Sequence, residues 1–254
     1  MPKHTIAILN QKGGVGKTTT AINLAAFLAK DKKRVLVCDA DPQGNTTSGL
    51  GLDKQTLDAT LYDVLFSRAD VGKAIREVTS HRIYLLPANA QLAGAEVELV
   101  SALQRESQLK RVLDKLEYDY IIIDCPPALG LLTVNALTAA DEVLIPVQAE
   151  YYALEGLSQL LSVIQQVKQA LNPSLNILGV VITLYDGRTS LAEQVKGEIE
   201  KHFGAKVFNT LIPRNVRLAE APSFGKTILE HDKWSKGARA YKALAKELER
   251  RLNG

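Results

Sequence analysis

Two kinds of hydrophobic pattern alternate along the 254-residue chain. Short apolar runs bounded by polar or turn-forming residues predict buried strands, and longer stretches with apolar residues every three or four positions predict helices. The predicted strands lie at 5–9, 34–38, 82–87, 118–123, 142–147, 177–184 and 207–212. The predicted helices lie at 17–30, 57–66, 71–78, 92–116, 131–140, 154–171, 190–203 and 236–252.

The order of these elements indicates the fold class. Strands that alternate with helices throughout a chain are typical of a parallel sheet with helices on both faces. The continuous apolar run 121–123 agrees, because strands covered on both faces carry apolar residues at successive positions. The chain shows no internal repeat, linker or low-complexity stretch. We therefore expect an α/β protein in which residues 1–254 form a single domain, built on a doubly wound, mostly parallel sheet.

Composition is typical of a globular protein of the cytoplasm. Hydrophobic residues make up 46% of the chain and charged residues 23%. No apolar run approaches the roughly 20 residues that span a bilayer, and residues 1–4 lead into a strand without a signal peptide. The two cysteines, Cys38 and Cys125, are too few for a disulfide framework, so we expect buried thiols in a reducing compartment.

Positive charge is concentrated at the C-terminal end. The whole chain has a formal net charge of +3, whereas residues 214–254 carry ten Lys or Arg against five Asp or Glu. A basic end on a near-neutral body suggests a polyanion as partner, and a solvated lysine-rich helix face is the alternative. Four cations of the last predicted helix recur at spacings that form one stripe: Arg239, Lys242, Lys246 and Arg250.

A glycine-rich segment, 12–19, follows the first predicted strand and opens the first predicted helix. In this context backbone N–H groups and the positive end of the helix dipole form a phosphate cradle. Lys17 is expected to reach the β- and γ-phosphates, and Thr18 to bind Mg²⁺ through its hydroxyl. Gln11 stands where the standard phosphate loop has a glycine, and a second lysine, Lys12, follows it. The expected nucleotide-binding residues are Gly13, Gly14, Val15, Gly16, Lys17, Thr18 and Thr19.

Three aspartates follow predicted strands and should project towards this loop. Asp39 and Asp41 end one strand and Asp124 ends another, and the carboxyl ends of parallel strands share one edge of the sheet. Asp124 is suited to order the ligands of a phosphate-bound Mg²⁺, and Asp41 to orient a water that attacks the γ-phosphate. For an isolated aspartate, the alternative role is to cap a turn or helix.

These motifs resemble those of a known family. The run Lys12-Gly13-Gly14-Val15-Gly16-Lys17-Thr18-Thr19 resembles the deviant Walker A box of the ParA/Soj and MinD group of ATPases, in which the extra lysine is the defining residue. The segments 39–45 and 121–127 resemble the family's switch I and its Walker B and switch II. Further segments similar to chromosomal ParA (Soj) lie at 147–152, 185–189 and 212–217. The resemblance covers nearly the whole chain and implies a fold of the P-loop NTPase type and a slow, Mg²⁺-dependent ATP hydrolase.

The resemblance also implies roles for single residues within one subunit. Lys17 and Thr18 would hold phosphate and Mg²⁺. Asp41 would position the attacking water near the metal, and Asp124 would order the metal's ligand shell. Pro213 and Asn215 would frame the adenine.

Other roles implied by the resemblance cross a dimer interface. Lys12 would reach the partner subunit's nucleotide and neutralise charge developing on the phosphates, as an arginine finger does. Glu150 would touch the ribose across the interface. ATP would thus hold a homodimer together, and hydrolysis would release it.

The resemblance further implies a role in chromosome or plasmid segregation. Arg188 and Arg217 resemble the arginines through which Soj-type proteins bind double-stranded DNA without sequence preference. The ATP-bound dimer would then associate with the nucleoid, and a ParB-like partner would stimulate hydrolysis and release it.

Two other functions are compatible with a phosphate loop. A MinD-like, membrane-associated cell-division ATPase needs a C-terminal amphipathic helix with bulky apolar residues; residues 246–254 lack these, so we expect no membrane partner. A small-molecule phosphotransferase is the second alternative, although no acceptor-binding lid is evident in the sequence.

Overall fold

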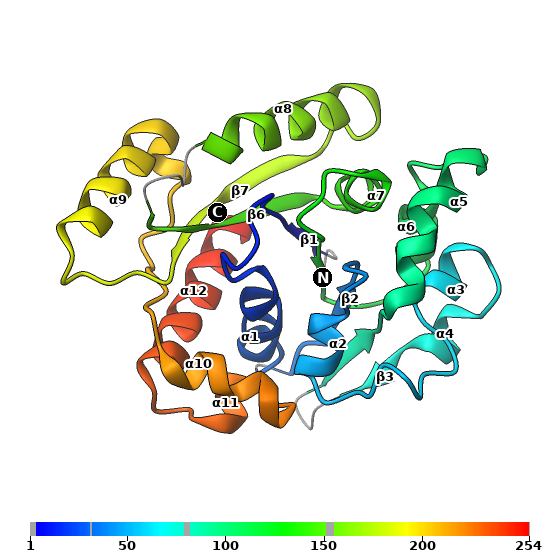
Figure 1. Ribbon diagram of the computed structural model, residues 1–254, viewed down its shortest axis with the longest axis horizontal. Coiled ribbons are helices and arrows are strands. Elements are labelled where there is room, and N and C mark those ends of the chain that lie inside the picture. Colours follow the sequence, from blue (N-terminus) through cyan, green and yellow to red (C-terminus); the bar gives the residue numbers. More distant parts are fainter. Residues whose placement is uncertain (1–3, 31, 79–81, 151–154, 254) are drawn as a thin grey trace.

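The computed structural model describes residues 4–30, 32–78, 82–150 and 155–253. Its centre is a seven-stranded sheet with the strand order β3-β4-β2-β5-β1-β6-β7, flanked by helices (Figure 1). Neighbouring strands run parallel except for the antiparallel edge pair β3–β4, which confirms the predicted fold class. The strands are β1 (His4–Ile8), β2 (Val35–Asp39), β3 (Arg76–Glu77), β4 (Ile83–Leu86), β5 (Tyr120–Asp124), β6 (Glu142–Gln148) and β7 (Asn176–Thr183).

Helices cover both faces of the sheet, because alternate residues of a strand point to opposite sides. In β1, Ile6 and Ile8 belong to the core shared with α1 and α12, whereas Ala7 belongs to the core on the other face. The α-helices are α1 (Lys17–Ala29), α2 (Asn45–Gly49), α3 (Leu61–Leu65), α4 (Val71–Ala74), α5 (Ala95–Ser101), α6 (Gln108–Leu113), α7 (Leu131–Ala139), α8 (Glu155–Ala170), α9 (Ser190–Phe203), α10 (Val216–Glu220), α11 (Ile228–His231) and α12 (Lys236–Asn253). Short 3-10 helices lie at η1 (Ala90–Gly94), η2 (Gly204–Lys206) and η3 (Ala221–Phe224).

The strand register brings the predicted site together. Asp124 at the end of β5 pairs with Ile8 at the end of β1 and with Asp39 at the end of β2. The loop after β1 and the aspartates therefore lie at one edge of the sheet, as the parallel arrangement predicts. Cys38 and Cys125 are buried and not disulfide-bonded. None of the helices within the described ranges has the length and apolar character needed to cross a membrane.

The predicted helix 92–116 is wrong as a single element. It is divided into η1, α5 and α6, because the backbone turns extended at Ala102. Asn135 of α7 stabilises the break: its amide donates to the carbonyl of Arg105 at 2.8 Å, and its Oδ1 accepts the N–H of Leu109 at 3.1 Å. The helix predicted at 71–78 ends at Ala74, where the chain continues into the edge strand β3.

The predicted strand 207–212 is also wrong. This segment makes only isolated bridges, Val180 with Val207 and Tyr185 with Pro213, among the described residues. Between them, the carboxylate of Glu247 on α12 accepts the backbone N–H groups of Asn209 and Thr210 at 2.8 and 2.9 Å. The N–H groups of Phe208 and Ile212 still donate to the β7 carbonyls of Val180 and Ile182, so a helix side chain takes the place of the strand neighbour only in the middle of the segment.

The loop after α2 and the loop after η3 contact each other through backbone atoms. Gly51 follows α2, Gly225 follows η3, and both have positive φ, +86° and +62°. A Cβ on Gly225 would lie 2.6 Å from the Cα of Gly51. Only glycines allow this approach, which joins the segment after Asp41 to the segment that carries α10 and η3.

Candidate nucleotide-binding site

Glycines allow the loop after β1 to curl over the N-terminus of α1. Gly14 and Gly16 have φ of +74° and +87°, in the left-handed region that residues with a Cβ rarely adopt. Gly16 is the N-cap of α1 and brings no capping side chain, so the first-turn N–H groups of this helix remain suited to an anion. Thr183 of β7 donates to the carbonyl of Val15 at 2.7 Å and holds the loop in place.

The Lys17 side chain is held at the base of this loop. Lys17 is buried, and its Nζ donates to the carbonyl of Lys12 at 3.3 Å. Burial lowers the pKa of Lys17, and the charges of Asp124 and Asp41 oppose this effect. A phosphate placed against Nζ would restore the stability of the ammonium form, because an opposite charge offsets desolvation.

The two carboxylate oxygens of Asp124 differ in their partners, and this difference suits a Mg²⁺ site. Thr18 and Thr46 both donate to its Oδ2 at 2.7 Å, whereas its Oδ1 is buried and accepts no hydrogen bond from any described residue. Burial raises the pKa of Asp124 to about 6, although the two hydroxyls favour the charged form. A cation would compensate this buried charge. The residues therefore fit Mg²⁺, which is commonly held by one or two carboxylates together with waters and phosphates.

Asp39 and Asp41 serve different purposes at the end of β2. Asp39 is fully buried, and its Oδ2 accepts the N–H and the hydroxyl of Thr47 at 2.8 and 2.7 Å, so it anchors α2. Burial and the neighbouring charge of Asp124 raise the pKa of Asp39 to about 7. Asp41 lines the phosphate cavity, and its Oδ1 accepts the N–H of Gln43 at 2.9 Å. Capping therefore accounts for Asp39, whereas Asp41 faces the cavity.

Two cavities adjoin at this edge of the sheet; we call the one at the phosphate loop the phosphate cavity and the smaller one, lined by the two residues predicted to frame the adenine, the base cavity. The first, of about 330 Å³, is lined by Gly13, Gly14, Gly16, Lys17, Thr18, Thr19, Asp41, Gln43, Asn45 and Pro127. The second, of about 100 Å³, shares Gly16 and Thr19 with it and continues to Thr183, Leu184, Ile212, Pro213, Asn215, Leu218, Ala219 and Tyr241. Pro213 and Asn215 are thus next to the phosphate loop although they are about 200 positions away in sequence.

Lys12 does not line the phosphate cavity of its own chain. Its Nζ forms an ion pair with Oε2 of Glu150 at 2.9 Å, and the two side chains are 40% and 47% exposed. Gln148 also donates to Glu150. The two residues predicted to act across an interface are therefore paired with each other at the surface. Tyr151 and Tyr152, in the family-like segment after Glu150, and Leu154, the first residue of a predicted helix, lie outside the described residues.

The two predicted DNA-binding arginines lie outside both cavities. Arg188 makes a bidentate pair with Asp186, at 2.8 and 2.6 Å, and its side chain is 88% exposed. Arg217 on α10 pairs with Glu220 at 2.9 Å and lies 3.8 Å from Asp232.

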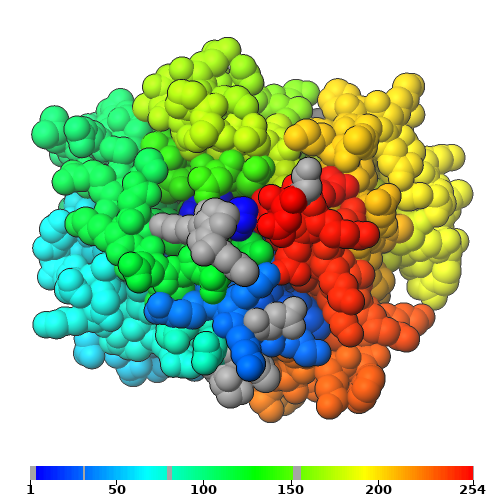
Figure 2. Space-filling model, turned by 180° about the vertical axis from the view of Figure 1, so that it is seen from behind, coloured from blue at the N-terminus to red at the C-terminus, as the bar shows by residue number. Residues whose placement is uncertain are grey.

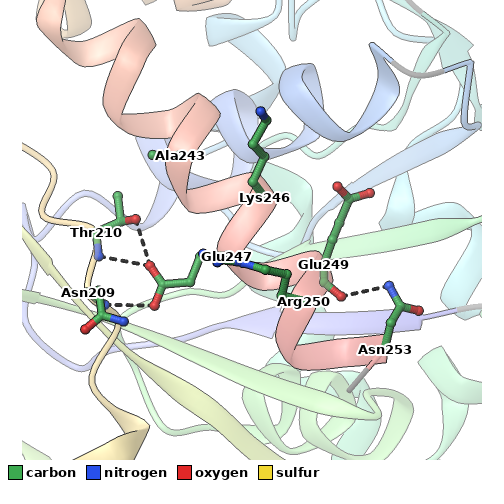
Figure 3. A pocket seen from close by; sticks show the side chains of 8 residues that line it. All are labelled: Asn209, Thr210, Ala243, Lys246, Glu247, Glu249, Arg250 and Asn253. Atoms are coloured by element: carbon green, nitrogen blue, oxygen red, sulfur yellow. Dashed lines mark hydrogen bonds between the residues drawn. The ribbon is translucent and has the colours of Figure 1, made fainter.

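The predicted stripe on α12 is solvent-exposed, and the other face of this helix is buried. Figure 2 shows α12 uncovered on the face of the molecule opposite to the view of Figure 1. Arg239, Lys242, Lys246 and Arg250 are exposed, whereas Tyr241, Leu244 and Leu248 are buried against the sheet. Lys246 and Arg250 line an open groove of about 670 Å³ beside Glu247 (Figure 3).

Sequence reasoning missed Thr46 as a site residue. Thr46 lies directly after the segment that resembles switch I, and its hydroxyl contacts the metal-suited carboxylate. Its position on α2, a five-residue helix anchored by Asp39, could not be predicted from apolar spacing. Gln43 and Asn45 also line the cavity, and both belong to the switch-like segment itself.

A glycine loop at a helix N-terminus, a buried lysine and a threonine–aspartate pair define a P-loop NTPase. The family model described as AAA domain matches residues 3–177. The sporulation initiation inhibitor protein Soj of Bacillus subtilis is 58% identical over 245 residues, which are 96% of this chain and 97% of that protein. The chromosome partitioning protein ParA of Myxococcus xanthus is 53% identical, with 97% of this chain and 88% of that protein aligned.

The fold is shared with solved structures that contain nucleotide. The crystal structure of cobyrinic acid a,c-diamide synthase from Mycobacterium smegmatis with bound ATP analogue and magnesium has a TM-score of 0.88 to this chain at 40% identity. The superposed region covers 100% of this chain and 97% of the synthase chain. The chain belongs to the ParA/Soj family of ATPases within the ParA/MinD superfamily, as its motifs predicted.

Proposed function

We propose that this chain is an ATPase of chromosome or plasmid segregation that dimerises with ATP, binds DNA as a dimer and is released on hydrolysis. ATP and Mg²⁺ are its cofactors. A fold shared with a protein named as a synthase does not select one activity. The 58% identity with Soj over nearly the full length of both chains supports the partition role.

Each subunit binds and orients its own nucleotide. Lys17 and the first-turn N–H groups of α1 hold the phosphates, while Pro213 and Asn215 border the base. Thr18 and Asp124 hold Mg²⁺, which neutralises charge on the phosphates when bound. Asp41 faces the cavity beside the switch-like segment and orients the attacking water, so its position sets the rate of hydrolysis.

The observation that carries the dimer proposal is the placement of the two lysines. Lys17 lines the phosphate cavity, whereas Lys12 lies outside it and pairs with a half-exposed glutamate. An exposed ion pair contributes little stability, so Lys12 can exchange Glu150 for the phosphates of a second subunit. Glu150 is then free to contact the ribose of that subunit's nucleotide. Each active site is complete only in the dimer.

The charge distribution supports DNA as the polyanion. Arg188 and Arg217 are exposed, and the exposed stripe of α12 adds four cations. Because a dimer doubles the number of phosphate contacts, its affinity for DNA greatly exceeds that of a monomer. A ParB-like partner would stimulate hydrolysis and return the protein to its weakly binding state. Residues 1–254 act in this proposal as one domain with a basic end at 214–254.

Gel filtration and DNA binding with ADP and with ATP test this proposal. We expect the Asp41→Ala variant with ATP and Mg²⁺ to elute as a dimer and to bind a random-sequence duplex, and with ADP to do neither. Arg188→Glu should abolish DNA retention and leave the dimer intact. A monomer that ignores duplex DNA under both conditions would reduce the protein to a simple nucleotide binder. Retention unchanged by Arg188→Glu would move the DNA surface elsewhere.

A further inference from the structure

Three large apolar side chains are exposed on the segment that follows the base cavity. Trp234 is 79%, Val216 71% and Phe224 62% exposed. They lie on or beside α10, η3 and α11, at the lower edge of the molecule in Figure 1. All three belong to the stretch 216–234, and exposed large apolar side chains in one short stretch are candidates for an interaction surface. We call Val216, Phe224 and Trp234 the aromatic patch.

The two aromatic members of the patch, Phe224 and Trp234, contact residues at and after the C-terminus of α11. The ring of Phe224 stacks on His231 with centroids 5.1 Å apart. Nζ of Lys233 lies 5.3 Å from the centroid of the Trp234 ring. The carboxylate of Asp232 accepts the backbone N–H of Trp234 at 3.1 Å and lies 3.8 Å from Nε of Arg217, so the chain at Trp234 is close to a predicted DNA-binding residue.

The charge around the aromatic patch is positive towards solvent. The carboxylates of the segment are used locally: Glu220 pairs with Arg217, Glu230 caps α11 through Thr227, and Asp232 accepts from Trp234. In contrast, exposed lysines of this segment have no carboxylate partner within the described ranges: Lys226, Lys233 and Lys236. Cations without acidic partners beside exposed rings form a surface complementary to a polyanion that also offers apolar contacts.

We propose that the aromatic patch contacts double-stranded DNA directly, with Trp234 and Phe224 against the sugars and base edges of a groove while the flanking lysines meet phosphates. The proposal rests on the DNA binding inferred above and adds a non-ionic component to it. Proteins that combine basic side chains with apolar groups directed into the minor groove show the same chemistry. The contact depends little on base sequence, since the sugars are common to all sequences and apolar packing does not read the hydrogen-bonding pattern of the base edges.

A duplex suits this surface better than a lipid bilayer does. The ammonium group of Lys233 lies over the Trp234 ring, so insertion of the ring into hydrocarbon would carry a charge with it. Binding in a membrane interface requires a helix with one continuous apolar face, whereas α10 and α11 have five and four residues. A DNA groove accepts an isolated ring between two rows of phosphates.

The chain supplies its own probe, because Trp234 is its single tryptophan. In the Asp41→Ala background with ATP and Mg²⁺, we expect a random-sequence duplex to change the emission of Trp234. Trp234→Ala should weaken DNA binding about tenfold at every salt concentration without changing the salt slope, because the lost contact is apolar. Phe224→Ala should have a smaller effect of the same kind. Lys233→Ala should instead reduce the slope by about one.

Leu103→Ala is the matched control, since Leu103 is an 85% exposed apolar residue beyond α5 and should not alter DNA binding. Unchanged emission together with equal affinities of the Trp234→Ala and Leu103→Ala variants would overturn the aromatic contact while leaving DNA binding itself intact. Emission that responds to vesicles of phosphatidylglycerol and phosphatidylcholine, but not to the duplex, would overturn it in favour of a membrane. A parent protein that binds no DNA would refute the proposed function as well.

Discussion

Arg188 already has an anionic ligand in the monomer. Asp186 binds its guanidinium through both carboxylate oxygens and also accepts its backbone N–H. These hydrogen bonds from Arg188 lower the pKa of Asp186 to about 2, so the carboxylate stays charged at neutral pH. In the proposed DNA complex, a phosphate would have to compete with this carboxylate for the same donors, so Asp186 would reduce the affinity of Arg188 for DNA.

Asp186→Asn should increase DNA binding by the ATP-bound dimer. An asparagine retains an oxygen for the N–H of Arg188 and preserves the turn, but it removes the competing charge. We expect about fivefold tighter binding at low salt and a steeper salt slope by about one, measured by titration of a labelled duplex. Asp114→Asn releases Lys110 from a similar exposed pair on α6 and serves as control. Equal affinities of the two variants would mean that Asp186 does not compete.

The sequence predicted the residues whose roles follow from local chemistry. The phosphate loop, Asp124 and the cavity-facing Asp41 lie where their positions after strands indicated. The pairing of Lys12 with Glu150 was not predictable, because it joins positions 138 residues apart through loops after β1 and β6. The sequence places Asp39 at the same sheet edge as Asp41 and Asp124 and leaves capping as its alternative role, and the structure shows that Asp39 anchors Thr47.

At the level of elements, the buried carboxylate of Glu247 joins α12 to the segment 207–212. Glu247 accepts the N–H groups of Asn209 and Thr210 and the hydroxyl of Thr210, and it pairs with Arg251 at 3.0 Å. Burial opposes ionisation of Glu247, but these hydrogen bonds outweigh it and lower its pKa below the ordinary value of 4.5. The segment that was predicted to be a strand is thereby attached to the last helix.

Glu247→Gln should lower the free energy of unfolding by about 2 kcal/mol at pH 7, because a buried carboxylate that accepts several hydrogen bonds loses its charge. A lowered folded-state pKa means that the carboxylate stabilises the protein above about pH 4.5, and that this contribution disappears as the pH falls through the folded-state pKa. The difference between variant and parent should therefore shrink in acid, as measured by urea denaturation. Glu117→Gln, at an exposed position, should stay within about 0.5 kcal/mol of the parent. A pH-independent difference would exclude the charge as the cause.

Elements were predictable where the apolar pattern alone decides the structure. The central strands and α9 occur within a residue or two of their predicted bounds. The long region 92–116 keeps helical spacing across its break, because each piece packs on the same face of the sheet, so periodicity could not reveal the interruption at Ala102. The segment 207–212 has an apolar pattern typical of a strand, but only its ends, Phe208 and Ile212, hydrogen-bond to the backbone of β7, and the N–H groups between them donate to a side chain.

On the scale of the whole molecule, each active site of the proposed dimer takes groups from two chains. Lys12→Ala should leave ATP binding largely intact and reduce turnover at least about a hundredfold, as loss of an arginine finger does. Asp41→Ala should be inactive because the water is no longer oriented. Neither single variant reveals which subunit supplies each group.

Mixing the Lys12→Ala and Asp41→Ala variants tests whether Lys12 acts on the nucleotide of its own subunit or on that of the partner subunit. A mixed dimer has one site with intact Asp41 that receives Lys12 from the other subunit. An equal mixture should therefore recover about a quarter of the parent turnover, measured as phosphate release. A mixture as inactive as its components would show that Lys12 acts on its own nucleotide, contrary to the dimer proposal.

The contact between Gly51 and Gly225 affects when DNA would be released in the proposed ATPase cycle. Small displacements between neighbouring segments are ordinarily taken up by rotation of the side chains that separate them, and here none intervenes. A shift of the chain beyond Asp41 when phosphate departs would therefore push directly on the loop that bears Phe224. In the proposed function, release of DNA would then coincide with the departure of phosphate, with no slower step between the two events.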